Sequence, residues 1–247
     1  AAWIEALAEY GTMRFGDVAK YAERYAREGF PVYSVFAQFI TENEEAYRRS
    51  PATEAIYLPN GRPPEVGEIF VQTDLAASIQ YMIDQEQSAS GDRLQGIQAA
   101  RDAFYKGDIA RKICDFHITN GGFMRMEDMA NYCVQYEEPL SVSFHDAEIL
   151  TCGAWCQGIS LAQGFRMLEM LDPSKLKHNS ADYIHTMTEI LKLVFADREA
   201  FVTDPAFVDV PVAEMLDPKY LAKRMALIDA DHAHKGMPPA GAIPSGT

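Results

Sequence analysis

The chain has 247 residues, with 36 Asp and Glu against 22 Lys and Arg, so its formal net charge is −14. Such an acidic surface repels the phosphate groups of nucleic acids and of anionic membranes, and neither is an expected partner. No run of about 18 apolar residues is present, so the sequence predicts no membrane-spanning helix.

Amphipathic helices are predicted over most of the first 130 residues. The chain opens directly at Ala1, without an initiator Met or a visible signal peptide, which indicates a processed or truncated piece. Apolar residues at helical spacing predict helices that end at Gly11, at Gly29 and before Pro51. After a Pro- and Gly-rich loop over 58–70, the pattern predicts further helices over 73–87, 91–106, 108–119 and 125–132.

The pattern changes after residue 132. Alternating residues over 133–152, rich in Val, Tyr, Phe and Ile, predict two or three strands with a turn near His145 and Asp146. So small a sheet is marginal alone, and we expect it to join a larger sheet supplied by other sequence. Helices are predicted again over 153–171, over 181–201 and from 217, followed by a flexible tail over 231–247. We expect residues 1–247 to form a single domain.

The string "TCGAWCQG", residues 151–158, is the most unusual in the chain. Its two cysteines, Cys152 and Cys156, have a spacing that is only weakly typical of a zinc site or a redox pair, because structural zinc sites need further ligands. The sequence therefore predicts no metal site and leaves open whether the two thiols are bonded. Either Trp155 fills a pocket in a packed turn, or Trp155 and Gln157 line a cleft and are candidate substrate-lining residues.

Charged residues interrupt an apolar run in "FADREAFVTDPAFVDVP", residues 195–211. Asp197 and Arg198 fall in the last turns of a long helix, where a buried charge must be paired. We predict that both bind the backbone of the loop that follows, in which Asp204 and Asp209 accept backbone N–H groups. A structural clamp is favoured over a catalytic pair.

Four long strings resemble the large subunit of the γ-glutamyltranspeptidase family. They are "EYGTMRFGDVAKYAERYAREGFPV", "AARDAFYKGDIARKI", "NGGFMRMEDMANYCVQYEEPLSVSFHDAEILT" and "DYIHTMTEILKLVFADREAFVTDPAFVDVPVAEMLDPKYLAKRMALID". They cover nearly the whole chain in the order that the family has. This ordered resemblance is far more specific than any single motif.

The resemblance implies an α+β fold, the αββα sandwich of N-terminal-nucleophile (Ntn) hydrolases. This chain would be the mostly helical large-subunit part, completed by a small subunit cut from the same precursor. The catalytic Thr is expected just after Thr247, at the start of the small subunit, with its own α-amine as base. Thr247 itself is a less favoured candidate. No cofactor is implied, the substrate would be a small amide or γ-glutamyl compound, and higher oligomers of the heterodimer stay open.

Two departures from the family leave the substrate open. The family's first strands, with the Arg that binds the substrate α-carboxylate, precede Ala1, and "TCGAWCQG" stands where the family has a Pro- and Ser-rich turn. The alternatives are therefore a cephalosporin-acylase-like amidase and a non-catalytic scaffold. The sparse cysteines favour a cytoplasmic location, whereas exported family members leave the periplasm or secretion open.

Overall fold

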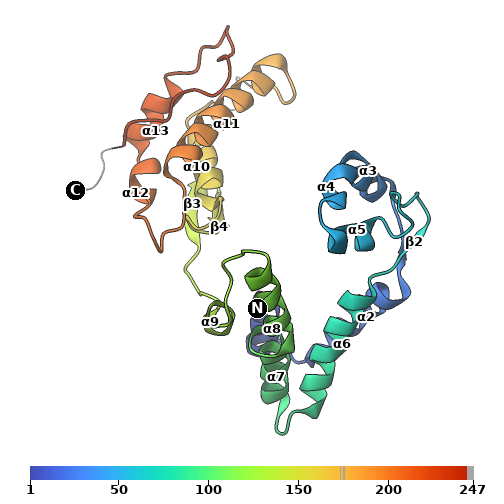
Figure 1. The fold of residues 1–247 in the computed structure, drawn as a ribbon. Helices are drawn as coiled ribbons and strands as arrows, with labels where there is room; N and C mark the ends of the chain where they lie inside the picture. The colour runs from blue at the N-terminus through green and yellow to red at the C-terminus, as the bar shows by residue number, and fades with distance from the viewer. Residues whose placement is uncertain (173, 175, 244–247) are drawn as a thin grey trace. The chain divides into compact units, whose positions relative to one another are not determined.

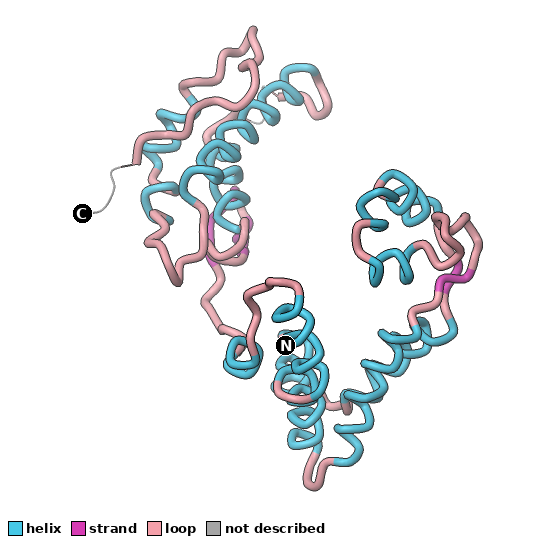
Figure 2. Tube along the Cα trace, in the orientation of Figure 1, coloured by secondary structure: helices cyan, strands magenta, loops and turns pink. Residues whose placement is uncertain are grey.

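The computed structural model describes residues 1–172, 174 and 176–243, which form two compact units, 1–135 and the part that begins at Tyr136. The less favoured nucleophile, Thr247, lies outside the described residues. Helix is the main element of both units (Figure 2). Each unit is described by itself, and the single domain over 1–247 stays a prediction.

The first unit consists of helices and one pair of very short strands (Figure 1). The bounds are α1 (Ala2–Tyr10), α2 (Phe15–Glu28), β1 (Phe30–Pro31), α3 (Ser34–Glu42), α4 (Glu44–Arg48), α5 (Pro51–Tyr57), β2 (Ile69–Phe70), α6 (Thr73–Ser88), α7 (Arg93–Tyr105), α8 (Asp108–Thr119) and α9 (Met126–Asn131). The two strands pair antiparallel, with Phe30 opposite Phe70.

Charged side chains tie the helices of this unit together at their ends. Glu86 of α6 is only 2% exposed and accepts the backbone N–H groups of Phe15 (2.6 Å) and Gly16 (2.7 Å) at the start of α2. A carboxylate at this point satisfies free N–H groups and offsets the positive end of the helix dipole. In the last turn of α1, the carbonyl oxygen of Leu7 accepts a hydrogen bond from the Arg93 side chain of α7 (3.1 Å).

One helix of this unit was not predicted. Residues 51–57 form α5, which begins at Pro51, the residue at which the sequence predicts a stop. Ser50 accepts the N–H of Thr53 (3.5 Å) and caps this helix. Proline is tolerated at the first helical position, because its missing N–H would have no partner there. The preceding helix, α4, already ends at Arg48, so Pro51 starts a helix and ends none.

The second unit packs a β-hairpin against helices. Its elements are β3 (Leu140–Phe144), β4 (Ala147–Thr151), α10 (Gly158–Glu169), α11 (Ala181–Phe201), α12 (Val212–Met215) and α13 (Pro218–Met225). The strands pair antiparallel from Leu140 opposite Thr151 to Phe144 opposite Ala147, so the turn lies at His145 and Asp146, as predicted.

Helix α10 lies at the centre of this unit and packs against the hairpin, α11 and α13. The buried core around it comprises Met167, Ile190, Leu193, Val194 and Leu221. Where α10 begins, a side chain at Gly158 would place its Cβ only 1.7 Å from the carbonyl oxygen of Cys152. Only glycine allows the end of β4 and the start of α10 to approach this closely.

The described part of the predicted flexible tail, 231–243, is bound to the helices. The N–H of His234 donates to Glu189 (3.2 Å), and its carbonyl oxygen accepts from Lys192 (2.7 Å). Further along, the N–H of Gly241 donates to Asp197 (2.9 Å). Charged side chains thus satisfy backbone groups of the tail over these residues, and the flexibility of 231–247 stays a prediction.

Candidate functional site

A hollow of about 440 Å³ lies beside the strand-to-helix turn of the second unit, and we call it the turn hollow. Its lining residues are Ala154, Trp155, Cys156, Gln157, Arg198, Glu199, Val202, Thr203 and Asp204. The structure thus brings the predicted cleft residues, Trp155 and Gln157, together with two of the four predicted clamp residues, Arg198 and Asp204. Sequence reasoning identified both groups but did not predict that they meet.

Glu137 fixes the turn that carries Trp155. Its Oε1 accepts the N–H of Gly153 (3.0 Å) and also the indole N–H of Trp155. Trp155 nevertheless is 60% exposed and fills no pocket among the described residues of this chain. Its role as a substrate-lining residue stays a prediction. The indole lies at the rim of the turn hollow, held at its polar end by a carboxylate.

The guanidinium of Arg198 is held in place on three sides. Its Nη1 donates to Oε1 of Gln157 (2.9 Å), its Nε donates to Oε1 of Glu199 (3.1 Å), and its Cζ lies 4.5 Å from the centre of the Phe195 ring. A planar guanidinium orientated in this way can bind a carboxylate or an amide oxygen. No His or Lys is among the described lining residues to act as a base for the Cys156 thiol. The arrangement suits binding rather than nucleophilic attack.

Asp197 has different partners from the ones predicted. It is fully buried, forms an ion pair with Arg224 (3.0 Å), and accepts from the Gln163 amide (2.9 Å) and from the N–H of Gly241 (2.9 Å). The predicted contact with the loop after the helix is therefore wrong. Consecutive helical residues point about 100° apart, so Asp197 faces the core while Arg198 faces the turn hollow.

The other two predicted clamp residues act locally or not at all. Asp204 accepts the N–H of Ala206 (2.9 Å), and its carbonyl oxygen accepts from Phe207 (3.1 Å), so it stabilises its own turn. Asp209 is exposed and makes no hydrogen bond or ion pair among the residues that the structure describes. Of these two residues, only Asp204 therefore accepts a backbone N–H group of the loop, as predicted.

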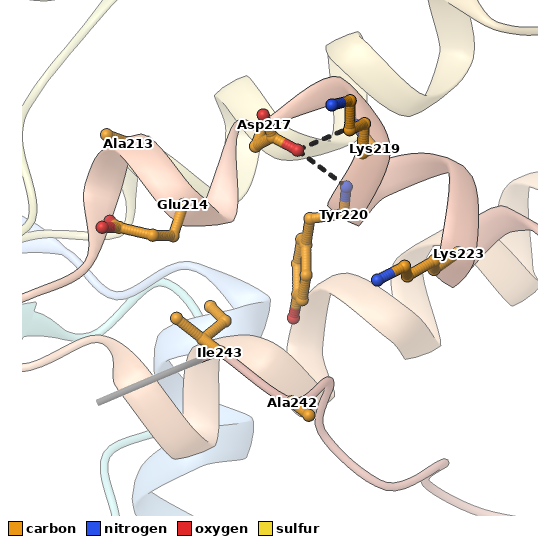
Figure 3. Close-up of a pocket in the computed structure, with 8 residues that line it drawn as sticks. All are labelled: Ala213, Glu214, Asp217, Lys219, Tyr220, Lys223, Ala242 and Ile243. Atoms are coloured by element: carbon orange, nitrogen blue, oxygen red, sulfur yellow. Dashed lines mark hydrogen bonds between the residues drawn. The ribbon is translucent and has the colours of Figure 1, made fainter. Parts of the chain in front are cut away.

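A second hollow, which sequence reasoning missed, also has a volume of about 440 Å³ and lies between α13 and the tail. Figure 3 shows its lining residues Ala213, Glu214, Asp217, Lys219, Tyr220, Lys223, Ala242 and Ile243. Asp217 caps α13 by accepting the N–H groups of Lys219 (2.9 Å) and Tyr220 (3.0 Å). Burial raises the pKa of the Tyr220 hydroxyl, and the nearby Asp197 carboxylate adds to this effect. The available signal in the sequence was Asp217-Pro218, which predicts the start of α13 but not the hollow beside it.

The cysteines and the acidic groups show no metal or disulfide chemistry in the described part of the chain. All four cysteines are free thiols, including Cys152 and Cys156. No group of three or more His, Cys, Asp or Glu among the described residues is placed to hold a metal ion. Among the described residues, no helix is both long and apolar enough to span a membrane.

Comparison with known proteins places the chain in a family. The family model described as Gamma-glutamyltranspeptidase matches residues 1–244. The acylase ACY 1 proenzyme of Pseudomonas sp. (strain SE83) is 35% identical over 94% of this chain and 39% of its own length. The glutathione hydrolase proenzyme of Bacillus subtilis (strain 168) is 32% identical over 96% of this chain and 38% of its own length. The structure of Helicobacter pylori gamma-glutamyltranspeptidase has a TM-score of 0.83 at 24% identity, covering 99% of this chain and 67% of that chain. The chain belongs to the gamma-glutamyltranspeptidase family.

Proposed function

We propose that this chain is the large-subunit portion of a self-processing amide hydrolase or acyltransferase. The observation that carries the proposal is the family match over residues 1–244, combined with relatives that are proenzymes more than twice as long as the matched region. A second chain cut from the same precursor would supply the small subunit. Its N-terminal Thr, just after Thr247, would be the nucleophile.

The reaction would proceed through an acyl-enzyme. The Thr hydroxyl attacks the carbonyl carbon of the substrate amide, assisted by the free α-amine of the same residue, and the amine product leaves. Water or a second amine then takes the acyl group and restores the hydroxyl. Within this chain, Trp155 and Gln157 would line the substrate site, and Arg198 would orientate an acidic or amide group of the substrate in the turn hollow.

We infer that the β3–β4 hairpin joins the αββα sandwich of Ntn hydrolases through the second chain. A two-stranded hairpin is marginal alone. Leu150 of β4 is 60% exposed, and Ile184 and Leu191 of α11 are 53% and 49% exposed. Apolar surface of this extent is typical of a face that another chain covers.

A second candidate is a cephalosporin-acylase-like amidase. Two acylase proenzymes of Pseudomonas sp. are 35% and 34% identical to this chain, whereas the glutathione hydrolase of Bacillus subtilis is 32% identical. The turn "TCGAWCQG" also departs from the Pro- and Ser-rich turn of γ-glutamyl enzymes. A side-chain amide of a β-lactam would then replace the γ-glutamyl substrate. For either candidate we propose a cytoplasmic location, which the four free thiols support.

The test uses the full-length precursor, purified and followed by intact mass. We expect two chains after self-cleavage and turnover of γ-glutamyl-p-nitroanilide, of β-lactam side-chain amides, or of both. The matched control replaces the Thr that begins the small subunit with Ala, which should abolish cleavage and turnover. A single uncut chain without turnover on any amide would instead favour the non-catalytic scaffold.

A further inference from the structure

Two buried charged residues bind the backbone of the tail. Arg224 is 3% exposed and donates from Nη1 to the carbonyl oxygen of Pro239 (3.0 Å), while the fully buried Asp197 accepts the N–H of Gly241 (2.9 Å). The two side chains are joined by an ion pair of 3.0 Å. We call these four residues the tail anchor. It fixes the two ends of a three-residue stretch, so it sets the direction in which the chain continues.

Stability alone does not account for such a pair. Buried ion pairs contribute little net stability, because desolvation of the two charges offsets their attraction, and apolar residues of similar size often serve as well. In the tail anchor, however, each charge also binds one peptide group of the tail. An apolar pair would fill the same volume but would leave the backbone of the tail unbound.

The tail approaches α13 too closely for any side chain at position 241. A Cβ on Gly241 would lie 2.2 Å from the hydroxyl oxygen of Tyr220 and 2.6 Å from its Cζ. Figure 3 shows the Tyr220 ring directed from α13 towards the segment that carries Ala242 and Ile243. The ring and the Asp197 carboxylate therefore hold Gly241 from two sides.

We propose that the tail anchor positions the chain for self-cleavage of the precursor, with Asp197 and Arg224 as positioning residues. The proposal rests on the proposed function. In self-cleavage the Thr hydroxyl attacks the carbonyl carbon of the residue before it. The peptide C–N bond then breaks as its nitrogen takes the hydroxyl proton. Water then hydrolyses the resulting ester to a carboxylate and a free Thr hydroxyl.

The distance along the chain makes this role effective. Position 247 is six residues beyond Gly241, a stretch that spans about 20 Å at most. Fixing its start removes much of the conformational freedom that the reacting peptide would otherwise have to lose.

The test follows the processing rate of the full-length precursor. Gly241→Ala adds the Cβ that collides with Tyr220, and we expect cleavage to slow about tenfold or more. The control is Ala240→Ser, an exposed neighbour in the same stretch, which should leave the rate unchanged. In a Tyr220→Ala background the added methyl group has room, so Gly241→Ala should slow cleavage less than about twofold relative to Tyr220→Ala alone.

The outcomes separate the inference from the proposed function. If the wild-type precursor never cleaves, the proposed function fails. If it cleaves, and Gly241→Ala cleaves as fast as Ala240→Ser, the tail anchor has no positioning role. The inference is also overturned if the slowing persists without the Tyr220 ring, or if kcat and the melting temperature of the processed enzyme fall together with the processing rate.

Discussion

Asp197 and Arg198 are neighbours in the sequence, yet they serve different parts of the second unit. The sequence was sufficient to predict that a charge inside an apolar run must be paired. It could not identify the partners, because Arg224 and Gly241 are separated from Asp197 by 27 and 44 residues. The direction of each side chain depends on the rotation of α11 against its neighbours, which no local pattern specifies.

Replacing Asp197 tests its role as a buried clamp. Asp197→Ala leaves the Arg224 guanidinium buried without its counter-ion, and we expect a loss of about 3–5 kcal/mol in the free energy of unfolding. Asp209→Ala is the matched control, because Asp209 is exposed and should change stability by less than about 0.5 kcal/mol. Denaturant unfolding of the purified full-length precursor measures both, in a form whose processing is blocked in wild type and variants alike. Equal effects would contradict the burial argument.

Arg198→Lys tests the turn hollow as a substrate site. Lysine keeps the positive charge but loses the planar fork that Gln157, Glu199 and the Phe195 ring orientate. For a substrate with an acidic group, we expect KM to rise about tenfold with little change in kcat, as for the loss of one charged hydrogen bond. Arg111→Lys, on the exposed face of α8, is the control. An unchanged KM would exclude the turn hollow from substrate binding.

Helices were predicted well from their periodicity, and the exceptions have local causes. Proline breaks helix interiors, so Pro51 predicts a stop, whereas Ser50 and Pro51 together make a favourable helix start. The hairpin followed from the alternation and from the turn at His145. The contacts between elements could not be predicted, because they depend on packing between residues far apart in the sequence.

Two glycines of α10 make a matched pair for testing the strand-to-helix turn. Gly158→Ala would place a Cβ 1.7 Å from the backbone of Cys152, so β4 and α10 must separate and the melting temperature should fall by several degrees. Around Gly164, apart from the chain neighbours and the backbone of α10 itself, no atom of the described residues lies within 4 Å of an added Cβ. Gly164→Ala should therefore stabilise the helix by about 0.5–1 kcal/mol. A similar effect of both changes would show that the close approach is unimportant.

Glu189 makes the contact between α11 and the tail dependent on pH. Burial acts to raise its pKa, but hydrogen bonds from Lys192 and from the N–H of His234 outweigh it and hold the pKa below its usual value. The folded state therefore binds this proton less readily than the unfolded state. The resulting stabilisation is complete above the unfolded pKa of about 4.3 and is lost as the pH falls through the lower folded value.

The measurement compares unfolding of the purified protein between about pH 3 and pH 6. Glu189→Gln should reduce this pH dependence, whereas Glu214→Gln, an exposed carboxylate on α12, should retain it. If Glu189→Gln unfolds with the same pH profile as the wild type, the carboxylate does not supply the acid-sensitive stabilisation.

At the scale of the whole molecule, the exposed apolar side chains predict dependence on a second chain. Phe207 is 85% exposed and Leu161 of α10 is 51% exposed, in addition to the apolar residues of β4 and α11. Residues 1–247 expressed alone should therefore bind a hydrophobic dye much more strongly than the full-length precursor does. Equal dye binding by the two proteins would indicate that nothing in the precursor covers these side chains.

The resemblance of four ordered strings predicted the family, which the match over residues 1–244 confirms. It could not identify the substrate, because relatives of similar identity include both an acylase and a glutathione hydrolase. The cleft residues Trp155 and Gln157 were predicted from the sequence, but their meeting with Arg198 in the turn hollow was not, because Gln157 and Arg198 lie 41 residues apart.

The Asp197 carboxylate also has a consequence for biosynthesis. Its partners come from α10, α13 and the tail, so the last of them, Gly241, is made 44 residues after Asp197 itself. Contacts this distant in sequence form late in folding, because closing long loops costs entropy before any contact compensates for it. While the chain is still on the ribosome, the Asp197 carboxylate on α11 lacks Arg224 and the N–H of Gly241 until these residues have been synthesised. The polar contacts of Asp197 are therefore complete only when the segment next to the expected cleavage point has emerged, so these contacts and readiness for cleavage would arrive together.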